Sequence, residues 1–68
     1  MENDHLALRI RAFRKLKGYT QQELAERLGV SVAVLGAIER GTRRADSNIL
    51  EKIADVLSVG MNELLNRA

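Results

Sequence analysis

The sequence predicts an all-helical (all-α) domain made of five short helices. Apolar residues recur at spacings of three and four along most of the chain, which is the period of a helix buried on one face. No alternating apolar and polar run bounded by turn residues indicates a strand. With 68 residues, the chain is expected to form one compact domain over residues 1–68, frayed at residues 1–4.

The first helix is predicted over residues 4–17. Asp4 has the short acceptor side chain expected at an N-cap, and Gly18 provides the stop. Because the chain contains no proline, capping residues and glycines are the signals that mark its helix ends. The apolar residues at helical spacing, which we expect on the inner face, are Leu6, Ile10, Phe13 and Leu16.

The second and third helices are each opened by a hydroxyl residue and closed by a glycine. Thr20 and Glu23 form a capping box, in which each side chain can accept a hydrogen bond from the other residue's backbone amide. That helix ends at Gly29, and Ser31 caps the next helix, which ends at Gly41. The residues expected to face the core from these two helices are Leu24, Ala25, Leu28, Leu35 and Ile38.

Two further helices complete the predicted fold. Asp46 is the expected N-cap of the fourth helix, and the stretch Ser58-Val59-Gly60 ends it. Gly60 is a weak cap for a short fifth helix. The apolar residues at helical spacing are Ile49, Leu50, Ile53, Ala54 and Leu57 in the fourth helix, and Met61, Leu64 and Leu65 in the fifth.

The spacing within residues 21–40 is the most informative in the chain. Two helices are joined there by a very short turn around Gly29 and Val30, and so short a turn makes the helices cross steeply. Gly29 can adopt the positive φ that the turn needs, and Ala25 is small enough for the two backbones to approach. Because the turn, the small residue and the core-facing positions all agree, the stretch predicts a helix-turn-helix.

This stretch resembles the helix-turn-helix family of Cro and the phage repressors, also known as the xenobiotic-response-element-like regulators. The matching segments are QQELAERLGVS at 21–31 and IERG at 38–41, flanked by IRAFR at 10–14 and LEKIADVL at 50–57. The resemblance extends over about residues 6–65. It implies a compact five-helix domain like that of the lambda repressor, which binds operator DNA with its third helix in the major groove.

Two groups of residues are predicted to contact DNA phosphates. The start of the second helix, at Thr20, Gln21 and Gln22, points unpaired amides outward, where an anion can bind. In the family, the residue matching Gln21 touches the sugar-phosphate backbone. Arg43 and Arg44 lie in the loop that runs along the DNA in family members, and they would give salt-dependent affinity without base specificity.

Arg14 and Glu39 match a pair that links the first helix to the end of the third in this family. The resemblance therefore implies a structural salt bridge between them. An edge of the Arg14 guanidinium is expected to remain for a phosphate, whereas Glu39 is not expected to read bases.

The predicted recognition helix is unusually poor in hydrogen-bonding side chains. The positions that match the family's base readers, together with the helix cap, are Ser31, Val32, Ala33, Gly36 and Ala37. Three interpretations are open. The helix can read thymine methyl groups, or it can sit deep in the groove while DNA shape and the loop arginines give the preference. Alternatively, its apolar face binds a protein partner, with DNA binding weakened or lost.

The predicted function is therefore a sequence-specific transcriptional regulator, a repressor that binds a palindromic operator as a homodimer. The alternative is a protein-interaction module of the same fold. A module this small covers little DNA, and repressors of this type usually bind as dimers. Met61 and Leu65 of the fifth helix are the candidate dimer contacts, while Leu64 is more simply explained as a core residue.

Composition excludes several other classes of protein. The chain has no cysteine and a single histidine, His5, so thiol chemistry is absent and neither a metal site nor a catalytic triad is expected. We expect no enzyme activity, no cofactor, no membrane span and a cytoplasmic location, associated with the nucleoid when DNA is bound. The net charge is only +2, but Arg9–Arg44 is basic and the last third is mildly acidic.

Overall fold

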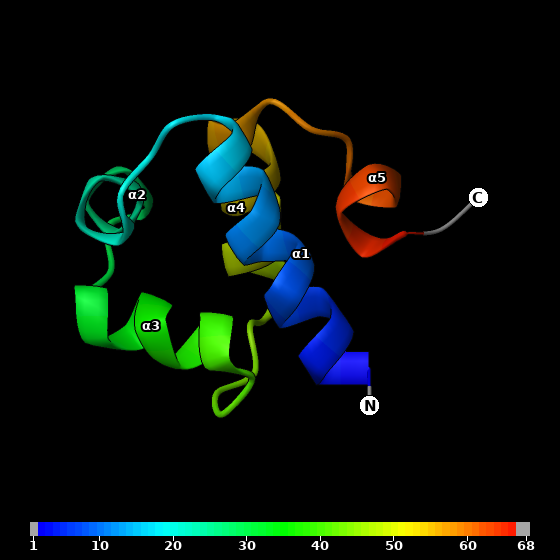
Figure 1. The fold of residues 1–68 in the computed structure, drawn as a ribbon, viewed down its shortest axis with the longest axis horizontal. Helices are drawn as coiled ribbons and strands as arrows, with labels where there is room; N and C mark the ends of the chain where they lie inside the picture. Colours follow the sequence, from blue (N-terminus) through cyan, green and yellow to red (C-terminus); the bar gives the residue numbers. More distant parts are fainter. Residues whose placement is uncertain (1, 67–68) are drawn as a thin grey trace.

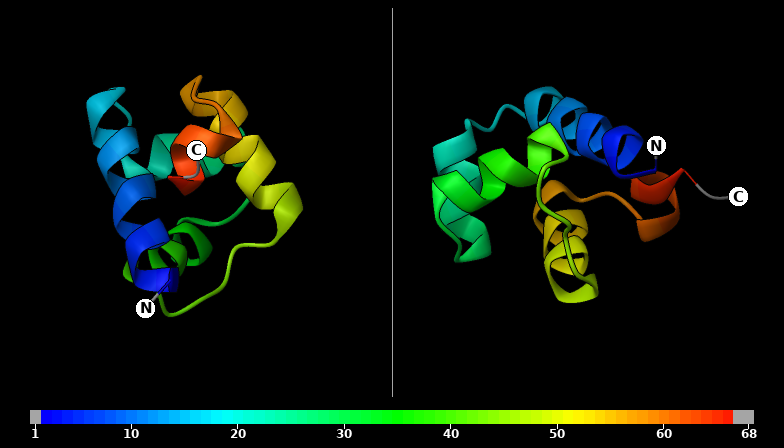
Figure 2. Two further views of the ribbon diagram at one scale, coloured as in Figure 1. Left: turned by 90° about the vertical axis from the view of Figure 1, so that its right-hand side faces the viewer. Right: turned by 90° about the horizontal axis from the view of Figure 1, so that it is seen from below.

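The computed structural model describes residues 2–66, which form five α-helices and no strand (Figure 1). The helices are α1 (Glu2–Leu16), α2 (Gln21–Leu28), α3 (Val32–Arg40), α4 (Ser47–Leu57) and α5 (Met61–Leu65). The domain measures 30 × 24 × 20 Å, and α3 and α5 lie toward opposite ends of its longest axis, with α1 and α4 between them (Figures 1 and 2). The all-helical five-helix prediction is confirmed.

The predicted caps set the boundaries of three helices. The side chains of Thr20, Ser31 and Asp46 each accept a hydrogen bond from the backbone amide three residues later, at 3.1, 3.1 and 2.9 Å. Gly29 and Gly41 end α2 and α3 in the left-handed conformation, with φ of 75° and 78°. These glycines turn the chain sharply because they have no Cβ to clash with the backbone.

The first helix differs from its prediction at both its start and its inner face. α1 begins at Glu2, so Asp4 lies inside the helix and is not its N-cap. Leu16 is 76% exposed, whereas Ala7, Ile10 and Arg14 are buried. The reason is geometric, because a residue six positions after Ile10 is turned about 120° away from it around the helix. The side chains that pack on the core are instead those of Ala7, Ile10 and Arg14, which follow one another at intervals of three and four residues.

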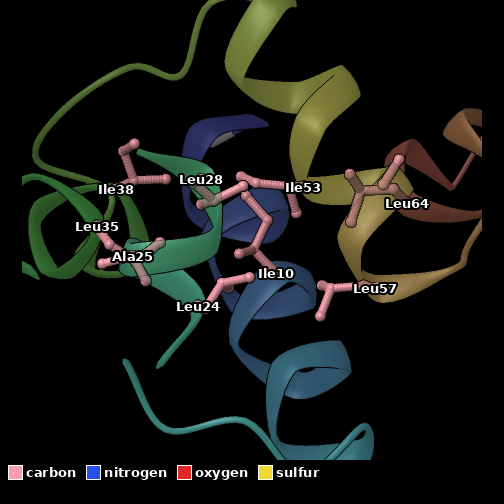
Figure 3. Close-up of a cluster of buried hydrophobic side chains, with 10 residues drawn as sticks. Ile10, Leu24, Ala25, Leu28, Leu35, Ile38, Ile53, Leu57 and Leu64 are labelled. Carbon is pink, nitrogen blue, oxygen red and sulfur yellow. The ribbon is translucent and has the colours of Figure 1, made fainter. Parts of the chain in front are cut away.

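The core lies between α1, α2, α3 and α4 and is closed at one end by α5 (Figure 3). Its buried members are Ile10, Leu24, Ala25, Leu28, Leu35, Ile38, Ile53, Ala54, Leu57 and Leu64. In Figure 1, α2 is seen end-on while α3 runs across the view, which is the predicted steep crossing. Because α3 packs on the core through one face only, its other face is left at the surface of the molecule.

Candidate nucleic-acid interface

The outer face of α3 carries the residues predicted to contact bases. Ser31, Val32 and Ala33 are exposed, Ala37 is half-buried and Gly36 is buried. Val32 is 47% exposed, which is high for a large apolar side chain. The Ser31 oxygen already accepts the hydrogen bond from the Val34 amide, so its hydroxyl hydrogen is what it can offer to a ligand. The first turn of α3 is therefore a small and mainly apolar surface.

Gly36 is buried because two long polar side chains cover it. A Cβ built at this glycine would lie 3.1 Å from Nη1 of Arg40 and 3.9 Å from the side-chain amide atoms of Gln21. Arg40 belongs to the last turn of α3, and helical side chains lean toward the N-terminus, so its guanidinium reaches back over the preceding turn. A glycine inside a helix costs about 1 kcal/mol relative to alanine, so Gly36 weakens α3 locally.

Arg40 is thus a surface cation on the recognition helix that the sequence predictions missed. It is exposed, and the one ion pair among the side chains of residues 5–66 joins other residues. The signal that could have found it is its position four residues after a glycine on the outer face of the helix. Because helical neighbours four residues apart lie side by side, a long side chain at the later position covers the earlier one.

The start of α2 presents free backbone donors beside this surface. The Thr20 hydroxyl accepts from the Glu23 amide, and the Glu23 carboxylate accepts from the Thr20 amide at 2.9 Å, so the predicted capping box is confirmed. The Thr20 backbone amide, then the Thr20 hydroxyl and the charge of Arg27, favour the ionised carboxylate and hold the pKa of Glu23 below its usual range. The amides of Gln21 and Gln22, in the first turn, have no acceptor within the helix and are available to an anion.

Arg14, Glu39 and Gln21 form a hydrogen-bonded network behind this surface. Arg14 donates from Nε and Nη2 to the two Glu39 carboxylate oxygens, at 2.7 and 3.1 Å, and from Nη1 to the Tyr19 carbonyl at 2.8 Å. The Gln21 side chain donates to the same carboxylate at 3.1 Å. Arg14 and Glu39 are only 7% and 5% exposed. The expected salt bridge is present, and it leaves little of the Arg14 guanidinium at the surface.

The loop after α3 carries the other predicted phosphate contacts. Arg43 and Arg44 are both exposed. The loop is held against the end of α3 because the carbonyl of Ala37 accepts from the Thr42 amide, the Thr42 hydroxyl and the Arg43 amide, at 3.0, 3.2 and 3.3 Å. The two arginines therefore project from a short and well-anchored segment next to the recognition helix.

The predicted dimer residues lie on α5, away from α3. Met61 and Leu65 are half-buried and one helical turn apart, whereas Leu64 is fully buried and belongs to the core. Arg9 of α1 donates from Nε to the Leu64 carbonyl at 3.0 Å and also bonds the Glu63 carbonyl. This arginine therefore caps the C-terminus of α5, a structural role that its place in a basic stretch did not reveal.

The part of the chain that the structure describes contains neither a cluster of side chains able to hold a metal ion nor a helix long and apolar enough to cross a membrane. What the described residues do bring together is the free start of α2 and the outer face of α3, where Gln21 and Arg40 both lie near Gly36. The arginine loop follows directly after α3, and its Arg44 also borders the groove that Leu65 lines. This arrangement is that of a helix-turn-helix presented for binding.

Comparison with known proteins identifies the class. A family model described as helix-turn-helix matches residues 10–64. The crystal structure of the clp gene regulator ClgR from Corynebacterium glutamicum superimposes with a TM-score of 0.93 at 32% identity, over 97% of this chain and 70% of that one. The chain belongs to the helix-turn-helix family of DNA-binding transcriptional regulators, a class without enzymatic activity.

Within this family, two relatives from Bacillus subtilis are similar in sequence. The HTH-type transcriptional regulator YazB is 53% identical over 64 residues, which are 94% of this chain and 93% of YazB. The regulator SinR is 44% identical over 59 residues, which are 85% of this chain and 53% of SinR. A crystal structure of SinR in complex with DNA superimposes with a TM-score of 0.82 at 41% identity, over 88% of this chain and 97% of that one.

Proposed function

We propose that the chain is a sequence-specific repressor that binds a palindromic operator as a homodimer, with α3 in the major groove. The observation that carries this proposal is the position of α3, whose outer face lies between two phosphate-binding elements, the free amides of α2 and the arginine loop. The similarity of the chain to SinR, which has been crystallised with DNA, also supports a DNA-binding function. The proposed location is the cytoplasm, at the nucleoid when operator is bound.

Selection of bound duplexes from a random DNA pool tests this function directly. We expect an enriched palindrome whose half-sites are centred about 34 Å apart, one helical turn of DNA. Failure to enrich any sequence would contradict the proposal. It would instead favour the alternative, a protein-interaction module that uses the mainly apolar outer face of α3, where Val32 and Ala33 are exposed.

The proposed phosphate contacts are backbone donors on one side of α3 and arginines on the other. Thr20, Gln21 and Gln22 stand at the start of α2, where the helix dipole and two free amides attract an anion. Arg43 and Arg44 contribute charge from the loop. The sixth proposed contact, Arg14, can offer only the small exposed edge that its bonds to Glu39 and Tyr19 leave.

Replacing both loop arginines, in Arg43→Ala/Arg44→Ala, is expected to weaken DNA binding for every sequence by a similar factor. Removing two phosphate contacts lowers the slope of log affinity against log salt concentration by about 2. Gel-shift titrations over a salt series measure this slope. The matched control is Lys52→Ala, which removes an exposed cation from α4 and should leave the slope unchanged. An unchanged slope in the double variant would contradict the loop's role.

The proposed base contacts of α3 are mainly apolar. Val32, Ala33 and Ala37 can pack on thymine methyl groups, and the Ser31 hydroxyl can donate a hydrogen bond, whereas Gly36, the other predicted base contact, is covered by the side chains of Arg40 and Gln21. Replacing contacted thymines of the selected operator by uracil should cost about 0.8 kcal/mol, or roughly fourfold in affinity, for each methyl removed. Equal affinity for the two operators would favour recognition of DNA shape.

Arg40 supplies a charged donor with two parallel N–H groups, which the other proposed base contacts lack. Its guanidinium lies along the outer face of α3, over Gly36. A guanidinium in the major groove can donate two parallel hydrogen bonds to the O6 and N7 atoms of guanine. We therefore add Arg40 to the proposed base readers, as a reader of guanine.

The proposed dimer contact is the surface of α5 around Met61 and Leu65. Leu65 borders an open groove in which the apolar side chains of Leu6, Ala45 and Leu50 are interspersed with polar ones, so a second subunit packed there would remove Leu65 from water. Leu65→Asp is expected to convert the protein to monomers in equilibrium sedimentation, because taking a carboxylate out of water in the subunit contact is costly. Leu8→Asp, at an exposed leucine of α1, is the control. A dimer that survives Leu65→Asp would exclude this surface.

A further inference from the structure

We infer that Gly36 is a positioning residue for base recognition: it has no side chain because the Arg40 guanidinium occupies the space where one would lie. This inference rests on the proposed function of α3 and names the feature that sets its sequence preference. It explains why the middle of the recognition helix holds the residue, other than proline, that is least favourable to a helix.

The backbone conformation does not require glycine at position 36. Gly36 lies within α3, and it is not among the glycines with positive φ, which are Gly18, Gly29 and Gly41. An alanine would therefore fit the backbone. The contact that opposes it is the one with Arg40, whose Nη1 lies 3.1 Å from the position of the missing Cβ.

The long Arg40 side chain that covers Gly36 depends on its surroundings for a fixed position. Arg40 is exposed, and it takes no part in the ion pair found among the described residues. Its guanidinium lies instead in the space that Gly36 leaves open, with Nη1 3.1 Å from the position of the missing Cβ. The Gln21 side chain borders the same space, with its amide atoms 3.9 Å from that Cβ position, and is held there by its hydrogen bond to the buried Glu39.

The geometry of hydrogen bonding to guanine limits how far the guanidinium can be displaced. Paired hydrogen bonds to guanine require the guanidinium to be placed within about 0.5 Å of its best position. A methyl group at residue 36 would push the guanidinium outward by a few tenths of an ångström, since 3.1 Å is too close for carbon and nitrogen atoms in contact. This shift takes up most of the tolerance, so the paired hydrogen bonds to guanine are expected to weaken and not to disappear. Alanine at this position is therefore expected to stabilise α3 and at the same time to impair its recognition of guanine.

The test is a double-mutant cycle on the selected operator, using Gly36→Ala, Arg40→Ala and the double variant. We expect Gly36→Ala to raise Tm by about 4–8 °C. We also expect it to weaken operator binding by about three- to tenfold, and Arg40→Ala to weaken it by about tenfold. In the double variant, adding Gly36→Ala to Arg40→Ala should cost no further affinity, because its effect passes through the arginine.

Two further arms locate the effect on the DNA and on the protein. Replacing operator guanines one at a time by 7-deazaguanine, which lacks N7, should weaken the wild type at one position per half-site and leave Arg40→Ala unaffected there. Gly60→Ala is the matched control, since a Cβ at Gly60 meets no atom within 4 Å; its operator affinity should equal that of the wild type.

Three outcomes would overturn the inference. These are unchanged operator affinity in Gly36→Ala, an equal loss whether or not Arg40 is present, and no guanine whose N7 matters to Arg40. An equal loss would mean that the new methyl group meets the DNA directly. All three outcomes differ from failure of the proposed function, in which the wild type itself enriches no operator.

Discussion

Replacing Glu39 by glutamine is expected to lower the free energy of unfolding by about 3–5 kcal/mol, because it leaves the buried Arg14 charge without its counter-ion. Both side chains are less than one-tenth exposed, so water cannot take over the role of the carboxylate. A domain of 68 residues is stable by only about 3–10 kcal/mol in total. Urea titrations followed by circular dichroism should therefore show a strongly reduced midpoint or a partly unfolded protein.

A second variant separates the loss of the ion pair from a general failure to fold. In Arg14→Met/Glu39→Leu both charges are removed together, and apolar replacements of a buried pair are often neutral. The Tyr19 carbonyl then loses its donor, which costs about 1–3 kcal/mol. We expect the double variant to be more stable than Glu39→Gln. If Glu39→Gln were as stable as the wild type, the pair would have no structural role.

Leu35→Ala is expected to cost about 2–5 kcal/mol, through lost burial and the cavity that remains. Leu35 is fully buried and is the inner anchor of α3, so its truncation loosens the recognition helix from the core. The cost is comparable with the whole stability of a domain of this size. Thermal unfolding should show a drop in Tm large enough to leave part of the protein unfolded at 37 °C.

The matched control for this truncation is Leu16→Ala, the same chemical change at a leucine that is 76% exposed. Exposed substitutions of this kind usually change stability by less than about 0.5 kcal/mol. A large loss at Leu16 would mean that this side chain is buried in solution, against another part of the chain or another molecule. Equal effects at the two leucines would contradict the core described above.

Most of the fold could be predicted from the sequence because its signals are local. The caps Thr20, Ser31 and Asp46, and the left-handed Gly29 and Gly41, act within one turn of the helices that they bound, and the structure confirms each of them. The start of α1 was the exception. No strong cap marks it, and Asp4, the residue predicted as the cap, lies within the range of the helix.

The inner face of α1 was harder to predict because tertiary packing decides it. Leu16 matched the helical period in the sequence, yet the space on the core side is taken by Arg14, which the Glu39 carboxylate neutralises. A charged side chain is an unlikely core residue until its partner from another helix is known. The family resemblance implied the Arg14–Glu39 pair, but hydropathy alone would not have found it.

The candidate site was predicted as a set of positions and not as a surface. Of the predicted base contacts, Ser31, Val32 and Ala33 are exposed, Ala37 is half-buried and Gly36 is covered, and their contacts with bases stay a prediction. Arg40 was missed because it lies at the end of the helix, beyond the matched base-reading positions. The direction in which its side chain folds back, over a residue four positions earlier, is a three-dimensional property.

α1 is hydrogen-bonded both to α3, which carries the proposed base contacts, and to α5, which carries the proposed dimer contact. Arg14 fixes it to α3, and Arg9 fixes it to the end of α5. The two arginines are five residues apart, about 7.5 Å along the helix axis. In a dimer assembled through α5, α1 would therefore fix the distance between the dimer contact and α3 within each subunit. That distance would set the separation of the two recognition helices, and with it the spacing of operator half-sites that the protein accepts.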